Sequence, residues 1–177
     1  AALSAPAVLG AARPRAVVIG GGAGGGTAAR YIAKDSGGAI DVTLIEPSRT
    51  YYTCFFSNLY IGGFRDYESL GHGYGTMAAG GVNVVHDWAV GVDRDAKEVA
   101  LASGSRVPYD RLVVSPGIDF RWETVPGYGV EAQSAMPHAW KGGTQAKLLR
   151  TQIDAMPEGG LFVMLAPPNP YRCPPGP

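Results

Sequence analysis

Three glycines at a fixed spacing are the residues of this chain that most directly indicate a ligand. Gly20, Gly22 and Gly25 form the pattern G-x-G-x-x-G, with branched apolar residues before it and helix-permissive residues after it. This order predicts a strand, a tight turn and a helix. In such a unit the first glycine makes the turn, the second admits a pyrophosphate and the third allows close packing of helix and strand. The free N–H groups of the helix then face the phosphates.

An acidic residue at the end of a second predicted strand extends this pattern. Residues 40–45 are mostly apolar or β-branched, and Glu46 follows them about 20 residues after Gly25. A carboxylate at this place can accept hydrogen bonds from the ribose hydroxyls of an adenine dinucleotide. The alternative is a glycine-rich turn that arose by chance in a chain with 26 glycines. The strand before the turn and the acid after it favour a Rossmann-type βαβ unit.

The two cysteines are the candidates for covalent or redox chemistry. Cys54 lies in the aromatic-rich block 51–58, and Cys173 lies in the proline-rich block 167–177. On residue types alone, the two could form one structural disulfide, or Cys54 could be a buried core thiol. The sequence shows no metal-ligand spacing and no C-x-x-C-H haem motif, so we expect no metal site in this chain, and haem, if one is involved, only on a partner.

The rest of the chain predicts the elements that would position these residues. Residues 82–85 and 112–115 indicate further buried strands, and short alternating runs in residues 88–108 indicate an antiparallel meander inserted into a parallel sheet. A helix is expected after Lys141, followed by an apolar strand over residues 161–166. The fold class is therefore α/β, with the start of a second βαβ domain at the end of the chain.

Length and composition limit the possibilities further. A chain of 177 residues can form one domain and part of another, and 15 basic against 15 acidic residues indicate no nucleic-acid or anionic-membrane partner. No apolar run is long enough for a transmembrane helix. Residues 1–12 are small, apolar and uncharged, as in a signal-peptide remnant, although a disordered tail would look similar. We expect a domain over 15–140, an incomplete second domain over 141–177, and export to the periplasm.

Several motifs together resemble a known family. The glycine pattern, Glu46, the meander and the strand motif of residues 109–117 look like the FAD domain of disulfide-reductase-like flavoproteins. The blocks 51–58, 137–141 and 171–177 closely resemble the flavoprotein subunit of flavocytochrome c sulfide dehydrogenase. The resemblance implies a Rossmann-like FAD-binding domain and an enzyme. The residues that it assigns to FAD are Gly20, Gly22, Gly25, Glu46, Cys54, Ser115, Pro116 and Gly117.

The resemblance also implies a reaction. Cys54 would hold the flavin covalently through the 8α carbon, and Cys173 would be the catalytic half of a redox disulfide whose second cysteine is expected beyond residue 177. Sulfide would attack this disulfide and leave a persulfide, and the electrons would pass through FAD to a c-type cytochrome subunit. The alternatives are an enzyme like sulfide:quinone oxidoreductase and a truncated, non-catalytic flavin-binding module.

Overall fold

The computed structural model describes residues 12–167 and divides the chain into two compact units. The first unit contains the residues up to Arg49 together with Gly73–Gly117. The second contains Thr50–His72 and the residues from Ile118 onward, so two segments of each unit alternate along the chain. The domain boundaries expected after residues 14 and 140 stay a prediction.

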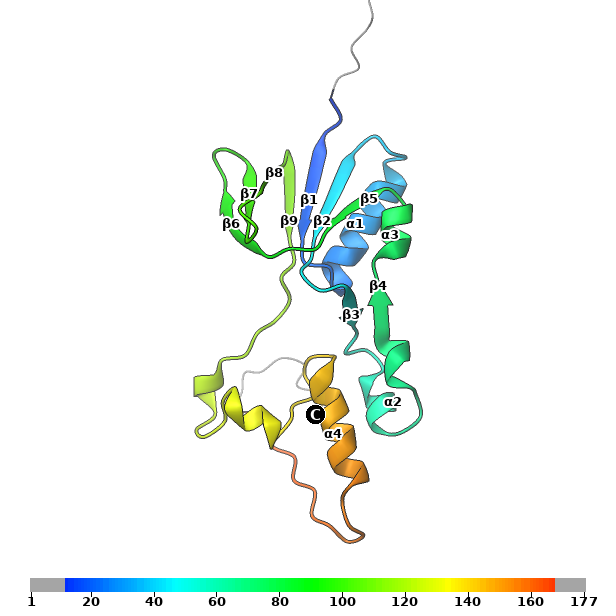
Figure 1. The fold of residues 1–177 in the computed structure, drawn as a ribbon, viewed down its shortest axis with the longest axis vertical. Helices are drawn as coiled ribbons and strands as arrows, with labels where there is room; N and C mark the ends of the chain where they lie inside the picture. Colours follow the sequence, from blue (N-terminus) through cyan, green and yellow to red (C-terminus); the bar gives the residue numbers. More distant parts are fainter. Residues whose placement is uncertain (1–11, 168–177) are drawn as a thin grey trace, which may run out of the picture. The chain divides into compact units, whose positions relative to one another are not determined.

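A parallel sheet is the centre of the first unit (Figure 1). Its strands, in spatial order, are β5 (Val82–Val85), β2 (Asp41–Ile45), β1 (Arg15–Ile19) and β9 (Arg111–Val114). Every predicted strand of this sheet is therefore present. In β1, Val17 and Val18 are at most 1% exposed, because strands of parallel sheets are covered on both faces.

Two helices and the meander cover this sheet. Helix α1 (Ala23–Asp35) packs against β1 and β2, and the short helix α3 (Gly75–Ala79) packs against β5. The predicted meander is confirmed as three antiparallel strands: β6 (Ala89–Asp93), β7 (Glu98–Leu101) and β8 (Arg106–Pro108). Val99 and Leu101 of β7 lie on one face of the meander and join Val17 in the buried core.

The second unit is built from shorter elements. It contains β3 (Thr50–Tyr52), which pairs with β4 (Gly71–Gly73), a strand whose last residue already belongs to the first unit. It also contains helices α2 (Ser57–Ile61) and α4 (Thr144–Asp154), which pack on each other. Three 3-10 turns complete it: Tyr67–Leu70, Trp122–Thr124 and Glu131–Ser134. Tyr52 stacks on Tyr67 at a centroid distance of 4.7 Å, and Leu70 is buried. The helix predicted after Lys141 is confirmed as α4.

The strand predicted over residues 161–166 is wrong. These residues form no regular structure, and the side chains of residues 161–165 are 53–87% exposed. A single extended segment leaves its backbone N–H and C=O groups unpaired, and no strand within residues 12–167 lies beside this one. An apolar run alone does not predict a strand, because it does not supply the neighbouring strand that its backbone must pair with.

Within the part of the chain that the structure describes, no helix is both long and apolar enough to cross a bilayer. Residues 12–167 likewise contain no cluster of three or more His, Cys, Asp or Glu side chains that could hold a metal ion.

Candidate dinucleotide-binding site

The turn between β1 and α1 has a steric requirement for glycine. Gly20 has φ +94°, and a Cβ there would collide with the carbonyl of Ser115. A Cβ on Gly25 would collide with the carbonyl of Gly20. Both obstacles are backbone atoms, which cannot rotate away as a side chain can. The first and third glycines of the predicted pattern therefore bring β1, α1 and the end of β9 into direct contact.

The first turn of α1 presents free hydrogen-bond donors. The helix begins after Gly22, and the N–H groups of its first turn lack intrahelical acceptors because no helical residue precedes them. Ala23 and Gly24 are exposed, and the first turn carries no acidic side chain. The positive end of the helix dipole is therefore accessible to an anion, as binding of a pyrophosphate requires.

Glu46 follows β2 and its carboxylate faces the glycine turn. Its Oε2 accepts a hydrogen bond from the Gly21 N–H at 2.7 Å, and its Oε1 accepts one from the Ser48 N–H at 2.8 Å. A carboxylate has about four acceptor positions, so about two stay available for another donor. The half-buried side chain is therefore fixed in orientation and still able to accept hydrogen bonds from ribose hydroxyls.

Two further residues, for which the sequence predicts no role, contact this arrangement. The buried Tyr74 hydroxyl donates to the Gly21 carbonyl at 3.1 Å. The Nδ1 atom of His86 lies 3.0 Å from the Glu46 carbonyl oxygen. The His86 ring packs edge-on to the Tyr74 ring, with centroids 5.8 Å apart. Because a carbonyl only accepts, Nδ1 is the protonated nitrogen. No sequence pattern marks these two residues; only the fold brings them beside the turn.

The strand motif Ser115-Pro116-Gly117 also lies at the turn. Ser115 N–H donates to the Ile19 carbonyl at 2.8 Å and continues the pairing of β9 with β1. Gly117 has φ +86°, which favours glycine. The first unit therefore contains seven of the eight predicted FAD residues: Gly20, Gly22, Gly25, Glu46, Ser115, Pro116 and Gly117. Their roles toward FAD stay a prediction.

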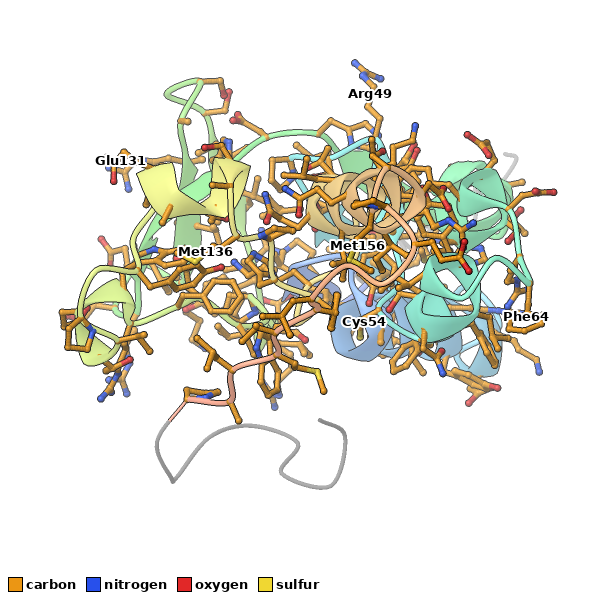
Figure 2. All side chains as sticks on the ribbon, turned by 90° about the horizontal axis from the view of Figure 1, so that it is seen from below. Arg49, Cys54, Phe64, Glu131, Met136 and Met156 are labelled. Carbon is orange, nitrogen blue, oxygen red and sulfur yellow. The ribbon has the colours of Figure 1, made fainter. Side chains whose placement is uncertain are left out.

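Cys54, the eighth residue, belongs to the second unit and is exposed there (Figure 2). The turn that carries it is tightly bonded: Thr53 Oγ1 donates to the Phe55 carbonyl at 2.9 Å, and Ser57 Oγ donates to the Cys54 carbonyl at 2.8 Å. Phe56 has φ +65°, an uncommon conformation for a non-glycine residue. Exposure contradicts the core-thiol alternative, and Cys54 forms no disulfide among residues 12–167. Cys173 lies outside the described residues, so its role stays a prediction.

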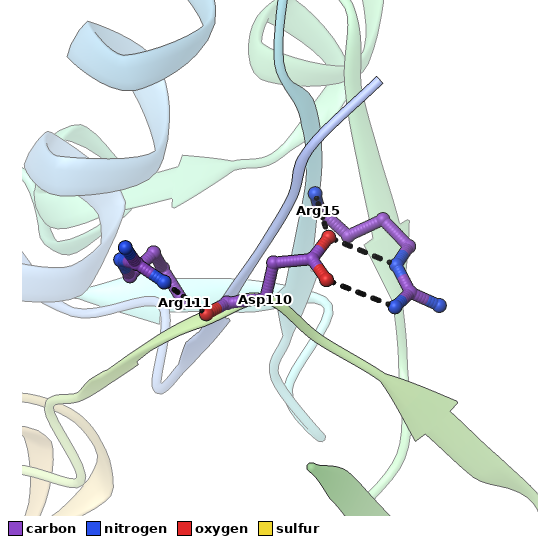
Figure 3. Close-up of polar contacts among 3 residues, drawn as sticks. All are labelled: Arg15, Asp110 and Arg111. Atoms are coloured by element: carbon purple, nitrogen blue, oxygen red, sulfur yellow. Dashed lines mark hydrogen bonds and ion pairs between the residues drawn. The ribbon is translucent and has the colours of Figure 1, made fainter. Parts of the chain in front are cut away.

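At the other end of β1, an ion pair joins Arg15, the first residue of β1, to Asp110, the residue directly before β9 (Figure 3). Asp110 accepts hydrogen bonds from Arg15 Nε and a terminal guanidinium nitrogen, both at 3.1 Å, and from the Arg15 backbone N–H at 2.7 Å. These bonds lower the pKa of Asp110 to about 2. Because the pair lies far along β1 from Gly20, its role is to hold β9 on β1.

The second unit contains a histidine in an aromatic cluster. His138 packs against Phe120 at a centroid distance of 4.5 Å, and its Nδ1 has no hydrogen-bond partner among the described residues. Burial, and then the nearby charge of Lys141, lower the pKa of His138. Lys141 itself pairs with Asp119 at 2.9 Å. The ring is therefore held neutral at pH 7.

Two family models match parts of this chain. The family model of the pyridine nucleotide-disulphide oxidoreductases matches residues 14–153, and that of the central region of the sulfide dehydrogenase [flavocytochrome c] flavoprotein chain matches residues 146–177. The chain is 50% identical over 44 residues to that flavoprotein chain in Chlorobaculum thiosulfatiphilum, which covers 25% of this chain and 90% of the relative.

Two longer proteins that resemble this chain are named as sulfide:quinone oxidoreductases. The chain is 28% identical over 111 residues to a mitochondrial sulfide:quinone oxidoreductase of Dictyostelium discoideum, covering 63% of this chain and 25% of that protein. The solved sulfide:quinone oxidoreductase of Aquifex aeolicus has the same fold, with a TM-score of 0.65 at 23% identity over 80% of this chain and 32% of its own. This chain therefore spans only about a quarter to a third of these two proteins.

The match over residues 14–153 and the identity to the Chlorobaculum relative lead to one assignment. The chain belongs to the pyridine nucleotide-disulphide oxidoreductase family, as an N-terminal portion of the kind found in the flavoprotein chain of flavocytochrome c sulfide dehydrogenase.

Proposed function

We propose that the first unit binds FAD and that the whole protein is a flavoprotein that oxidises sulfide. The observation that carries this proposal is the assembled glycine turn with Glu46 beside it, in a chain 50% identical to a sulfide dehydrogenase flavoprotein chain over 90% of that relative. The glycine turn supports the assignment of FAD as the cofactor, and the similarity to the relative supports the assignment of sulfide as the substrate.

The residues of the first unit fit an adenine dinucleotide part by part. The free N–H groups at the start of α1 would bind the pyrophosphate, and Glu46 would accept the ribose hydroxyls. The backbone of Ser115, Pro116 and Gly117 would approach the rest of the cofactor, because the strand end lies at Gly20. FAD, when bound, supplies two-electron acceptance and one-electron release.

Cys54 is the proposed covalent attachment point. The thiol is exposed on a turn that two side-chain hydrogen bonds fix, so a cofactor atom can reach it without local unfolding. The test is to denature the purified protein and measure the flavin that stays attached. Cys54→Ala should release all of it, whereas the matched variant Cys173→Ala should retain it. Attachment that survives Cys54→Ala would contradict this assignment.

Cys173 is proposed as one half of the disulfide that sulfide attacks. The sulfur of HS⁻ would form a bond to one cysteine sulfur while the disulfide bond breaks, which yields a persulfide and a thiolate. A second HS⁻ would take the outer sulfur of the persulfide as hydrodisulfide and leave two cysteine thiols, which would form the disulfide again as they lose two electrons. FAD, when bound, would accept these two electrons and allow them to pass singly to a c-type cytochrome partner. In the full-length protein, sulfide should reduce cytochrome c and Cys173→Ala should abolish this activity. Persistent activity in that variant would exclude the mechanism.

A second candidate is supported by the match to the Dictyostelium enzyme. A protein of that kind would deliver the electrons of sulfide to a quinone instead of a cytochrome. Parallel assays with cytochrome c and with a soluble quinone as the acceptor separate the two. A non-catalytic flavin-binding module would bind FAD and reduce neither cytochrome c nor the quinone.

The proposed periplasmic location rests on the composition of residues 1–12, and fractionation of cells for the mature protein tests it.

A further inference from the structure

Four residues of the first unit form a closed ring of contacts around the glycine turn. The Tyr74 hydroxyl donates to the Gly21 carbonyl at 3.1 Å, and the N–H of the same Gly21 donates to Glu46 Oε2 at 2.7 Å. The Glu46 carbonyl in turn accepts from His86 Nδ1 at 3.0 Å. The His86 ring then returns to Tyr74, with an angle of 60° between the ring planes.

Gly21 is held on two sides in this ring. A Cβ at Gly21 would lie 2.6 Å from the Tyr74 hydroxyl oxygen and 2.9 Å from Cγ of Glu46. Glycine has the greatest backbone freedom of any residue, so a glycine peptide that must aim its N–H needs restraint from its surroundings. Tyr74 supplies this restraint from one side. Its hydroxyl bonds the Gly21 carbonyl, and the N–H of Gly21 bonds the Glu46 carboxylate.

The backbone of Glu46 is restrained in the same way. Its N–H donates to the Val85 carbonyl at 2.9 Å, and its carbonyl accepts from His86. His86 therefore ties the residue that follows β2 to the residue that follows β5. Both ends of the Glu46 residue, backbone and carboxylate, are thus fixed before any ligand binds.

We propose that Tyr74 and His86 are positioning residues that hold the Glu46 carboxylate in the orientation required to accept the ribose hydroxyls of the dinucleotide. The proposal rests on the proposed FAD site and assigns two further residues to it. Neither residue needs to touch the ligand. Substitution of either residue should therefore change the ratio of the Kd values for nucleotides without and with a ribose hydroxyl. The Glu46 carboxylate controls this ratio, because it would accept the hydrogen bond of that hydroxyl.

The experiment measures nucleotide binding by calorimetry in the flavin-free chain, prepared in a Cys54→Ser background. The probes are ADP, 2′-deoxy-ADP and 3′-deoxy-ADP, and the readout is the larger of the two ratios of Kd for deoxy analogue to Kd for ADP. Hydrogen bonds to a carboxylate predict a ratio of about 10 to 100. Glu46→Gln should lower this ratio roughly tenfold. Tyr74→Phe and His86→Ala should each lower it about threefold to tenfold.

Matched variants separate positioning from general weakening. Tyr128→Phe removes the same kind of bond, a tyrosine hydroxyl to the Met136 carbonyl at 2.9 Å, but in the second unit, so it should leave the ratio unchanged. His86→Asn retains a donor near the place of Nδ1 and should restore the ratio lost in His86→Ala. Because His86 is exposed, this pair still tests the proposal if Tyr74→Phe does not fold.

The outcomes are distinguishable. If Glu46→Gln lowers the ratio but Tyr74→Phe and His86→Ala do not, or if these weaken all three nucleotides equally, the positioning roles are refuted and the FAD site stands. If the unmutated turn binds no ADP, or does not distinguish it from either deoxy analogue, the assignment of Glu46 and with it the proposed site fails.

Discussion

Two apolar segments of this chain, residues 16–19 of β1 and residues 161–165, differ in exposure. Val17 and Val18 in β1 are at most 1% exposed, whereas Leu161 and Leu165 are 87% and 81% exposed. β1 has β2 on one side and β9 on the other, and α1 and the meander contact the sheet. Residues 161–165 have no such neighbours within the described part of the chain. The burial of an apolar strand is thus a property of its neighbours and not of its own residues.

The same contrast applies to the chemistry of the two units. In the first unit, four segments distant in sequence meet at one turn, through Gly20, Glu46, Tyr74 and Ser115. In the second unit, the turn that presents the Cys54 thiol is fixed mainly by bonds among residues 53–57, with one longer-range bond from the Thr53 N–H to the Leu70 carbonyl at 3.0 Å. A binding site made from several strands depends on the whole fold, while a nucleophile on a short turn depends mainly on local bonds.

The largest expected effect tests the burial comparison with one substitution at two places. Leu44→Ala in β2, where the side chain is fully buried, should lower the free energy of unfolding by about 2–5 kcal/mol. Leu161→Ala should change it by less than about 0.5 kcal/mol, because the side chain is already in solvent. Urea unfolding followed by circular dichroism measures both. A comparable loss in the two variants would mean that residues 161–165 are buried in solution.

A second, smaller effect compares glycines of the two units. Gly25→Ala should destabilise the protein by about 1–3 kcal/mol and prevent FAD retention, because the new Cβ meets the Gly20 carbonyl. At Gly129, in the second unit, a Cβ would make only an ordinary contact of 3.5 Å with Glu131. Gly129→Ala should therefore keep both stability and flavin. Thermal unfolding and flavin content after gel filtration report the two results, and equal behaviour would remove the steric argument for the turn.

The smallest effect concerns two exposed carboxylates. Asp110, bonded to Arg15, has its pKa lowered to about 2, and Asp119, bonded chiefly to Lys141, also has a lowered pKa. A carboxylate whose pKa is lowered by folding stabilises the folded protein at pH values above its unfolded pKa of about 3.9. This stabilisation is lost as the pH falls through the pKa of the folded protein. Asp110→Asn should therefore lower Tm at pH 7, with the difference from the unmodified protein closing near pH 2. Asp119→Asn should have a smaller effect, because it removes fewer bonds.

A series of melting curves from pH 7 to pH 2 measures this dependence. A difference for Asp110→Asn that stays constant over the whole range would show that the pair does not titrate as described, and that the loss comes from packing instead.

Local patterns were sufficient to predict the elements of the first unit. Branched apolar runs predicted β1, β2, β5 and β9, and alternation predicted the meander, because these signals depend on side-chain period alone. The strand predicted over residues 161–166 failed for the complementary reason. Its residues carry the same signal, but a strand forms only where a second strand pairs with its backbone.

Part of the candidate site could be predicted from the sequence in the same way, and part could not. The spacing of the glycines and the position of Glu46 are fixed by the βαβ unit itself, so sequence positions could identify them. Tyr74 and His86 reach the turn from α3 and β5, elements whose placement depends on the completed sheet. A lone tyrosine before a short helix and a lone histidine after a strand have many possible surroundings. Only the folded structure brings these two residues to the glycine turn.

The bonds between Arg15 and Asp110 join residues 95 positions apart. Closing a loop of that length costs chain entropy before the contact returns any energy, and such non-local pairings slow folding. β1 and β2 lie close in sequence and can pair early, but the other edge of β1 stays open until β9 arrives, after the whole of residues 50–72 and the meander. We therefore expect the docking of β9 to limit the rate at which the glycine turn is completed, since Ser115 reaches Gly20 only with that strand.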